Sequence, residues 1–384
     1  MKVFCAKLIL ASIVLATNTD AFTIPSFSTV VANGVKEGRD SELIKNFDPS
    51  AKTIAVTGAT GRTGSLVVKE LLNRGNNVIA IVRDEQKAAD VLPVKFPPTA
   101  EKKNLIIKKC DLALEDNVIS TIQASDCDAS IWCATGFSDN ESQSFLDKLG
   151  AIFGVAVQPK KSIDAVGVPA LAKAFEGSED TDGPKVVMLS SAGVTRPSWS
   201  DEKKEQYKGC ADIPIVRLNP FNILNIKADS EERLRESGTP YCIFRPTGLN
   251  EDWPVGSRPI FSQGDVAVGR INRKDVAKIL VDCVFTKESV GKTFEAFSIE
   301  GYPPAEEISM ALGRLRLDSE GPMSEDALAA SYSAMQQLLP GEKQDPSQLA
   351  MGQTYEQLDK GETGRLGEKG EENAEAAAPK PTTV

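Results

Sequence analysis

Three glycines at a spacing of three residues constrain this chain most. An apolar run that contains Ile54 and Val56 breaks into Gly58, Gly61 and Gly64 and continues as an amphipathic helix. Gly58 permits a sharp turn after a short buried strand, Gly61 a close backbone approach to a ligand, and Gly64 close packing of helix on sheet. The helix N-terminus favours an anion, because its dipole end is positive. The stretch therefore predicts a cradle for the phosphates of a dinucleotide. Its expected lining residues are Gly58, Ala59, Thr60, Gly61, Arg62, Thr63 and Gly64.

The composition excludes several classes of function. With 41% hydrophobic and 26% charged residues among 384, the chain has the balance of a soluble globular protein. A formal net charge of -10 argues against a nucleic-acid partner, which needs clustered lysines and arginines. The absence of histidine removes histidine bases, Ser-His-Asp triads and histidine metal ligands. The seven cysteines form no Cys-x-x-Cys pair, so we expect buried free thiols and no metal site.

The first 48 residues resemble targeting sequence. Residues 1–21 place Lys2 and Lys7 before a short apolar run and small residues, which is typical of a signal peptide. Residues 22–48 begin with a hydroxyl-rich, acid-poor stretch that is typical of a transit peptide. The pair resembles the two-part presequences of algae with secondary plastids, with secretion as the alternative. We expect a plastid protein, in the stroma or at the thylakoid surface, without a membrane span in the mature chain.

From residue 50 onward, strand and helix signals alternate. After the opening strand, apolar runs suited to buried parallel strands lie at residues 78–82, 105–107, 129–132, 186–189 and 241–244. Helical segments are expected near residues 113–124, 162–176, 220–237 and 273–286. Such alternation predicts an α/β fold with a doubly wound parallel sheet, Rossmann-like with three αβα layers, over residues 50–300.

Local signals mark several helix ends. Gly75 and Gly238 are suited to left-handed stops, and Asn219 is expected to cap a helix that begins at Pro220. Asn272 and Asp275 form a plausible capping pair for the following helix. Beyond residue 300, helices near 305–313 and 324–338 predict a helical extension at 301–352. The polar residues 353–384 are expected to form a mostly disordered tail.

The residues after the second strand bear on the kind of dinucleotide. An NAD site usually places Asp or Glu there for the ribose hydroxyls, whereas an arginine attracts the 2′-phosphate of NADP. Val82 is followed by Arg83, and Arg62 inside the glycine stretch offers a second guanidinium. Asp84 weakens this argument slightly, and the alternative is that both arginines are exposed and idle. We therefore expect NADP rather than NAD as the cofactor.

Six sequence blocks together carry a resemblance to a known family. They are residues 57–64 (TGATGRTG), 82–84 (VRD), 110–112 (CDL), 190–193 (SSAG), 244–249 (FRPTGL) and 273–277 (RKDVA). In this order they resemble the NAD(P)-binding NmrA-like group of atypical short-chain dehydrogenases/reductases. Chloroplast members of that group include a dehydrogenase-like subunit of the import translocon. The resemblance implies that Asp111 and Leu112 contact the adenine and that Ser190 lies at the nicotinamide end. It also implies cofactor contacts from Ala134, Thr135, Gly136 and Pro246.

The resemblance also directs attention to a catalytic pair. Ordinary members use Tyr-x-x-x-Lys, in which one helical turn places both side chains on one face and the lysine lowers the tyrosine pKa. Lys227 fits the lysine, but Ile223 stands where the tyrosine is needed. Lys227 is expected to bind the nicotinamide ribose, and the alternative is a surface pair with Glu231. Ser190 is a candidate proton donor, and Ser191, a water or the substrate itself are the alternative donors. Both serines could instead satisfy backbone groups of their loop.

These observations lead to a main hypothesis and a rival. We expect a plastid NADP(H)-binding protein that either is an oxidoreductase with non-standard catalytic residues, Ser190 and Lys227, or binds the dinucleotide as a redox signal. The rival is a non-catalytic scaffold or assembly factor for a photosynthetic complex, docking through its C-terminal residues 301–384. No substrate is identified by the sequence, although residues 250–264 are expected to shape its pocket.

Overall fold

The computed structural model of the chain describes residues 47–48, 50–95, 104–136, 162–178, 182–219, 222–302 and 304–338. These residues belong to one compact unit that begins at Leu43. The expected signal peptide at 1–21, nearly all of the transit-like segment at 22–48 and the tail at 353–384 lie outside them. Within the described part of the chain, no helix combines the length and apolar character needed to cross a membrane.

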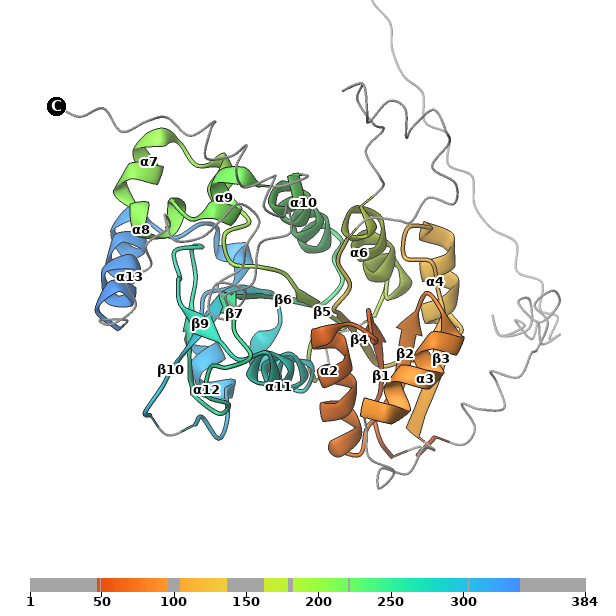
Figure 1. Ribbon diagram of the computed structural model, residues 1–384. Coiled ribbons are helices and arrows are strands. Elements are labelled where there is room, and N and C mark those ends of the chain that lie inside the picture. Colours follow the sequence, from red (N-terminus) through yellow and green to blue (C-terminus); the bar gives the residue numbers. More distant parts are fainter. Residues whose placement is uncertain are drawn as a thin grey trace, which may run out of the picture. The chain divides into compact units, whose positions relative to one another are not determined.

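A mostly parallel sheet of eight strands forms the centre of the domain (Figure 1). Its strands are β1 (Thr53–Thr57), β2 (Asn77–Val82), β3 (Leu105–Lys109), β4 (Ala129–Trp132), β5 (Val186–Leu189), β6 (Tyr241–Pro246), β8 (Arg258–Ser262) and β10 (Lys292–Ile299). Their order is β3-β2-β1-β4-β5-β6-β10-β8, so the order reverses between β1 and β4. The edge strand β8 runs antiparallel to β10, and the other pairs in this sheet are parallel.

Helices cover both faces of the sheet (Figure 1). One face carries α2 (Arg62–Asn73), α3 (Glu85–Lys95), α11 (Arg273–Val284) and α12 (Ser309–Gly313), and the other carries α4 (Glu115–Gln123), α6 (Ile163–Ala174) and α10 (Ile223–Glu236). The strands feed both cores because neighbouring residues face opposite ways: Ile54 and Val56 join the first core, and Ala55 joins the second. The expected three-layer Rossmann-like fold is confirmed.

A smaller lobe is built from segments that follow β5 and end the described chain. It contains α7 (Asp201–Gln206), α8 (Lys208–Ala211), α9 (Pro214–Leu218) and α13 (Glu325–Leu338). The ring of Tyr207 packs edge to face against Trp199 and Tyr332, with centroids 6.0 and 5.2 Å away. The Tyr332 hydroxyl accepts a hydrogen bond from the Gly209 N–H at 3.0 Å. These contacts fasten α13 to α7 and α8.

Asp318 joins the C-terminal extension to the sheet. It lies in a 3-10 turn (Asp318–Glu320), and its carboxylate accepts hydrogen bonds from the N–H and hydroxyl of Thr293 at 2.9 and 2.6 Å. The Tyr241 hydroxyl donates to the same carboxylate at 2.9 Å, and Arg235 Nε approaches it at 3.3 Å. Lys292 Nζ also donates to the carbonyl of Leu312 at 2.7 Å. The extension is therefore packed against β6, β10 and α10.

The structure differs from the sequence analysis at three local points. α10 begins at Ile223 rather than Pro220, because Asn219 has a left-handed backbone (φ 34°) that ends α9. The Asn219 side chain still accepts a hydrogen bond from the Leu224 N–H at 2.9 Å. Part of the expected pocket loop at 250–264 is the strand β8. The strand β10 carries no uniform apolar run, since polar residues such as Thr293 and Glu295 are buried by specific partners.

Candidate functional site

The glycine cradle, residues 58–64, forms a tight turn between β1 and α2. The Gly61 N–H donates to the Gly58 carbonyl at 2.8 Å, and Gly58 has a positive φ of 63°. A Cβ at Gly58 would lie 2.9 Å from the Ala134 backbone, and a Cβ at Gly64 would lie 2.2 Å from the Gly58 carbonyl oxygen. Both positions therefore require glycine, because neighbouring backbone occupies the space of a side chain.

The N-terminus of α2 is suited to an anion. Its N-cap residue, Gly61, offers no side chain, and the first turn holds no Asp or Glu. By contrast, α4 begins with acidic residues, and α11 has Asp275 in its first turn. The positive end of the α2 dipole is thus not neutralised by its own helix, which fits the pyrophosphate of a dinucleotide. Around it, Ala59 and Thr63 are buried, Thr60 is half-buried and Arg62 is exposed.

An open hollow lies beside the end of β2. It is lined by Arg83, Asp84, Glu85, Gln86 and Lys109. Arg83 follows β2 and Lys109 ends β3, so two adjacent parallel strands deliver cations to the same edge of the sheet. Glu85 accepts a hydrogen bond from the Lys109 N–H at 2.9 Å. The hollow therefore offers two cations, but it also holds two carboxylates.

Arg62 of the glycine cradle is directed toward the loop after β7 (Gly248–Leu249). Its Nη1 lies 3.9 Å from Glu251 Oε1, and its side chain is 65% exposed. Glu251 also forms an ion pair with the buried Arg273 at the start of α11. An exposed ion pair at this separation is weak.

Asp111 and Leu112 shape the turn that follows β3. Asp111 Oδ1 accepts a hydrogen bond from the Ala113 N–H at 2.9 Å, and the Asp111 N–H donates to Asn117 Oδ1 at 2.6 Å. Leu112 is buried, and a Cβ at Gly167 of α6 would lie 2.9 Å from its carbonyl oxygen. These contacts give both residues a structural role, and their contact with adenine stays a prediction.

The loop after β4 is fixed against the end of β1. The Cys133 N–H donates to the Thr57 hydroxyl at 3.2 Å, and the Ala134 backbone abuts Gly58. Gly136 has a positive φ of 126°, and its carbonyl accepts a hydrogen bond from Ile163 at 3.1 Å. Burial raises the pKa of the Cys133 thiol to about 12, so it is neutral at physiological pH. This loop lies where the strand order reverses, the usual binding edge of open α/β sheets.

Four side chains meet beyond the carboxyl end of β4, and we name them the Asp164 cluster. Asp164 is fully buried in the first turn of α6. Its Oδ1 accepts hydrogen bonds from Lys227 Nζ at 3.0 Å and from Trp132 Nε1 at 3.2 Å. Its Oδ2 accepts a longer one from the Thr135 hydroxyl at 3.4 Å. One carboxylate thus joins β4, the loop after it, α6 and α10.

Lys227 is buried, with 7% of its surface exposed, and its ion pair is with Asp164. The alternative surface pair with Glu231 is therefore wrong. Glu231 is itself buried and pairs with Arg235 (3.0 Å) and Arg245. Ile223, the first residue of α10, packs against an apolar cluster and supplies no hydroxyl one turn before Lys227.

Ser190 lies at the carboxyl end of β5. It is buried, and its N–H donates to the Phe244 carbonyl at 2.8 Å. Its hydroxyl makes no hydrogen bond of ordinary geometry within the described residues, although it faces the Glu231 carboxylate and lowers the pKa of that group. The Pro246 carbonyl accepts a hydrogen bond from Ala192 at 3.0 Å, which joins this loop to the end of β6.

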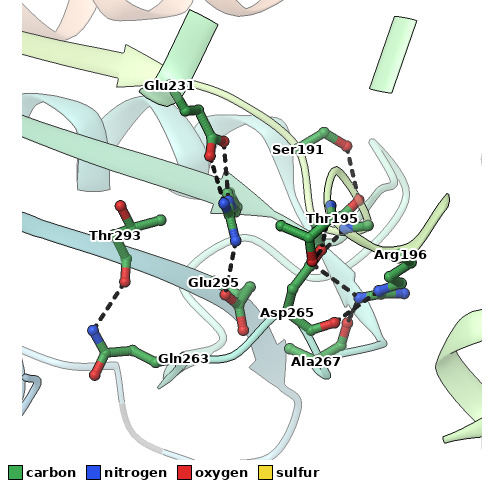
Figure 2. Close-up of polar contacts among 12 residues, drawn as sticks. Ser191, Thr195, Arg196, Glu231, Gln263, Asp265, Ala267, Thr293 and Glu295 are labelled. Atoms are coloured by element: carbon green, nitrogen blue, oxygen red, sulfur yellow. Dashed lines mark hydrogen bonds and ion pairs between the residues drawn. The ribbon is translucent and has the colours of Figure 1, made fainter. Parts of the chain in front are cut away.

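A buried charge network extends from Glu231 to Glu295 (Figure 2). Arg245 forms ion pairs with both carboxylates. Arg245 donates from Nε to Glu231 Oε1 at 3.0 Å and from Nη2 to Oε2, and its Nη1 lies 3.8 Å from Glu295 Oε1. Burial raises the pKa of Glu231, but Arg245 and Arg235 outweigh it, so this pKa lies below its usual range. Burial and the nearby Asp265 raise the pKa of Glu295 to about 8.

Asp265, in the segment between β8 and β9, fixes the loop that follows β5 (Figure 2). Its carboxylate accepts hydrogen bonds from the Gly193 N–H at 2.6 Å and from the N–H and hydroxyl of Thr195 at 2.9 and 2.7 Å. The buried Arg196 donates to the carbonyls of Asp265 at 2.8 Å and Ala267 at 2.7 Å. The segment that begins with Ser190 is therefore held by Pro246 of β6 and by Asp265.

The start of α11 holds the loop that follows β7. Asn272 caps the helix by accepting a hydrogen bond from the Lys274 N–H at 2.8 Å, as predicted. Its Nδ2 also donates to the Trp253 carbonyl at 2.6 Å. The Asp275 carboxylate accepts hydrogen bonds from the Gly256 N–H at 2.9 and 3.1 Å, so its predicted part in a capping pair is wrong. Its role is to fix the loop.

Two tyrosines that could have replaced the missing hydroxyl have other positions. Tyr207 is buried between Trp199 and Tyr332. Tyr241 begins β6, at the amino end of the strand, and its hydroxyl bonds to Asp318. Neither supplies a proton donor beside Lys227.

Sequence patterns did not indicate Asp164, Lys109 or Asp265 as residues of the site. For Asp164 there was a usable signal, because it is the only charged residue in the first ten positions of the apolar segment 163–174. Lys109 ends β3 next to Arg83, which becomes visible only once the strand order is known. Asp265 has a positive φ of 61° and acts through residues 70 positions away, so local sequence gives no indication of it.

The comparisons with known proteins agree with this geometry. A family model described as NAD(P)H-binding matches residues 58–287. An uncharacterized chloroplastic protein of Arabidopsis thaliana is 28% identical over 273 residues, which cover 70% of this chain and 83% of that protein. The chloroplastic protein TIC 62 of Pisum sativum is 28% identical over 233 residues, covering 58% of this chain and 36% of that protein.

A chloroplastic divinyl chlorophyllide a 8-vinyl-reductase of Cucumis sativus is 24% identical over 271 residues, covering 67% of this chain and 55% of that protein. The chain therefore spans only part of two of these three relatives. The family model covers more than half of the chain, and its description implies a nicotinamide dinucleotide as the ligand. The chain belongs to the NAD(P)H-binding family of Rossmann-fold proteins, in the NmrA-like group of atypical short-chain dehydrogenases/reductases.

Proposed function

We propose that this chain is a plastid protein that binds NADP(H), and that its main activity is to bind this dinucleotide as a redox signal. The main support for the proposal is a contrast between the phosphate-binding residues and the catalytic pair. The glycine cradle satisfies the geometry of a phosphate site, whereas Ile223 replaces the tyrosine and Asp164 holds the lysine. Binding is therefore better supported than turnover.

The proposed cofactor would lie across the point where the strand order reverses, with its phosphates near β1 to β3 and its nicotinamide near β4 and β5. The glycine cradle would hold the pyrophosphate, and Arg83 with Lys109 would attract a 2′-phosphate at the ends of β2 and β3. Ser190 and the Asp164 cluster lie on the β4 and β5 side, where the nicotinamide end is expected. A bound nicotinamide ring supplies or accepts a hydride.

A titration tests the choice of cofactor. NADPH and NADH are titrated separately while the fluorescence of Trp132 is followed, since its indole bonds to Asp164 beside Thr135. We expect tighter binding of NADPH, and in Arg83→Ala a loss of affinity for NADPH of about tenfold with little change for NADH. Equal affinities in the wild type would refute the 2′-phosphate argument.

Turnover is the second candidate activity, and one relative is named as a reductase. In that case Ser190 would deliver the proton, and the burial of its hydroxyl at the end of β5 supports this role. NADPH consumption is measured with a panel of quinones, aldehydes and isoprenoid ketones. A reductase consumes NADPH with at least one class and loses this activity in Ser190→Ala. No consumption across the panel would leave binding as the function.

The rival function is a scaffold or assembly factor for a photosynthetic complex. A truncation that tests this function should keep residues 301–338. α13 and Asp318 pack on the domain, so their removal would expose its core. A chain ending at residue 338 and the full chain are compared in pull-downs from stroma and thylakoid. Loss of a partner in the shorter chain supports docking through residues 339–384, and an identical partner set contradicts it.

The proposed location is the plastid, and three relatives have chloroplastic names. The further proposal of a secondary plastid depends on residues 1–48 alone. Fusion of residues 1–48 to a fluorescent protein tests it in an alga with such plastids. Fluorescence in the plastid supports the two-part presequence, and fluorescence in the medium supports secretion.

A further inference from the structure

The Asp164 cluster places a balanced pair of charges in a buried position. Asp164 is fully buried and Lys227 nearly so, with 3.0 Å between the carboxylate and the ammonium. The Trp132 indole and the Thr135 hydroxyl donate to the same carboxylate, and they fix its position. A buried lysine beside a fixed carboxylate contributes no net charge to its surroundings.

This arrangement differs from what a Tyr-x-x-x-Lys enzyme needs. There the unbalanced charge of the lysine lowers the pKa of the tyrosine, which then transfers a proton. In this chain Ile223 has no proton to transfer, so a positive charge at Lys227 has no such use. A positive charge would nevertheless act on any charged ligand group beyond the ends of β4 and β5.

The two forms of a nicotinamide dinucleotide differ in charge at the ring. The oxidised ring is a cation, and the reduced ring is neutral. An unbalanced ammonium would disfavour the oxidised form and leave the reduced form almost unaffected. We propose that Asp164, by balancing Lys227, sets the relative affinity of this site for the oxidised and the reduced dinucleotide. The inference rests on the proposed function, because it requires that the site binds NADP(H).

The central experiment measures the dissociation constants of NADP⁺ and NADPH for the wild type and for Asp164→Asn. A unit charge acting over about 10 Å at an effective dielectric constant of about 20 changes an affinity by roughly tenfold. We therefore expect the ratio of the NADP⁺ constant to the NADPH constant to rise about tenfold in the variant. The NADPH constant itself should change by less than about threefold.

Two further variants test the direction in which the ratio of the two dissociation constants changes. Lys227→Met leaves Asp164 unbalanced, so the ratio should fall below that of the wild type, even though both forms lose any contact with the lysine. The double variant Asp164→Asn with Lys227→Met contains neither charge, and its ratio should return close to the wild-type value. If Asp164→Asn does not fold, the single Lys227 variant and the double variant still test the proposal.

Asp282→Asn is a matched control. Asp282 also pairs with a basic side chain, Arg74, at 2.7 Å, but this pair joins the C-terminal ends of α2 and α11. The control should lower the melting temperature without changing the ratio. In the absence of any nucleotide, Asp164→Asn should also shift the emission of Trp132, whose indole loses a charged acceptor.

The possible outcomes separate the two proposals. A ratio that is unchanged in folded Asp164→Asn, or equal losses of affinity for both forms, would overturn the role of Asp164 while leaving NADP(H) binding intact. A wild-type protein that binds neither form would overturn the proposed function and this inference together. A rise in Asp164→Asn with a fall in Lys227→Met supports the inference.

Discussion

The part of the site at β1 to β3 and the part at β4 to β6, which meet where the strand order reverses, have different structural requirements. On the β1 to β3 side, backbone packs so closely in the glycine cradle that a Cβ added at Gly64 would lie 2.2 Å from the Gly58 carbonyl oxygen. On the β4 to β6 side, the loops are equally well fixed, yet Ile223 occupies the position of the proton-donating residue. Binding depends on backbone shape and turnover on side-chain chemistry. The backbone shape of a glycine cradle is thus present in a chain that lacks the tyrosine of the Tyr-x-x-x-Lys pair.

The largest effect is expected from Gly64→Ala. The added Cβ would lie 2.2 Å from the Gly58 carbonyl oxygen, so α2 must move away from β1. We expect a loss of at least about 3 kcal/mol in the free energy of unfolding by urea, together with loss of NADPH binding. Gly75→Ala is the control: it has φ of 79° but open space, so it should cost about 1 kcal/mol and leave binding unchanged. Equal losses in the two variants would break the argument that the cradle is fixed by backbone contact.

A second prediction restores the missing chemistry. Ile223→Tyr places a hydroxyl one helical turn before Lys227, and a general acid contributes on the order of a hundredfold or more to a rate. We expect faster NADPH consumption with carbonyl substrates than in the matched control Ile223→Phe. The gain should stay below about a hundredfold, because Asp164 balances the lysine charge that would lower the pKa of the new tyrosine. The rates are measured by absorbance with the same panel of substrates. Equal rates in the two variants would show that the β4 to β6 side lacks more than a proton donor.

The third prediction concerns stability against pH. The pKa of Glu295 is about 8 in the folded protein, above its ordinary value of 4.5, because of burial and Asp265. Between these values the folded state holds a proton that the unfolded chain has released, so stability should fall as pH rises from about 5 to 8. The slope is at most about 1.4 kcal/mol per pH unit.

Urea unfolding at several pH values measures this slope, and Glu295→Gln is the control. The variant carries no titrating group at this position, so its stability should depend less on pH over the same range. The NADPH affinity of the glycine cradle should not follow the Glu295 titration. Equal slopes in the wild type and the variant would contradict the assignment to Glu295.

The smallest effect is expected from Lys109→Ala. Lys109 lines the hollow beside Arg83, but both it and the hollow are open to solvent. An exposed ion pair contributes up to about 1 kcal/mol, so the affinity for NADPH should fall about threefold and that for NADH should not change. Parallel titrations measure both affinities. A similar fall for NADH would mean that Lys109 acts on a group common to both cofactors.

The sequence was sufficient for the fold wherever the signal was local. The apolar runs at β1, β2 and β4 and the stops at Gly75 and Gly238 were all predicted, because each depends on residues adjacent in the chain. β10 was missed because its burial depends on distant partners. Glu295 forms an ion pair with Arg245, which lies 50 positions earlier, and the Thr293 hydroxyl donates a hydrogen bond to Asp318.

The site shows the same division. The turn of the glycine cradle was predicted from its spacing, and Lys227 was selected as a candidate through a family pattern. The partner of Lys227 was not found, because Asp164 lies 63 positions before it and the two meet only after α6 and α10 pack together. Glu231, four positions after Lys227, was the nearest carboxylate by helical spacing, but it is recruited by Arg245 on β6. Local spacing cannot decide between two partners when one of them comes from another helix.

The attachment of the C-terminal extension has a consequence for the order in which the domain is completed. The family match ends at residue 287, before β10 begins at Lys292, and β10 is in turn held by Asp318. A fragment designed from the family boundary would leave Phe244 without the ring of Phe294 that stacks on it at 5.2 Å. The cofactor-binding strands are also synthesised long before the residues that close the sheet. The growing chain therefore presents an unfinished sheet edge until its last quarter has emerged, and a recombinant fragment should extend to residue 338.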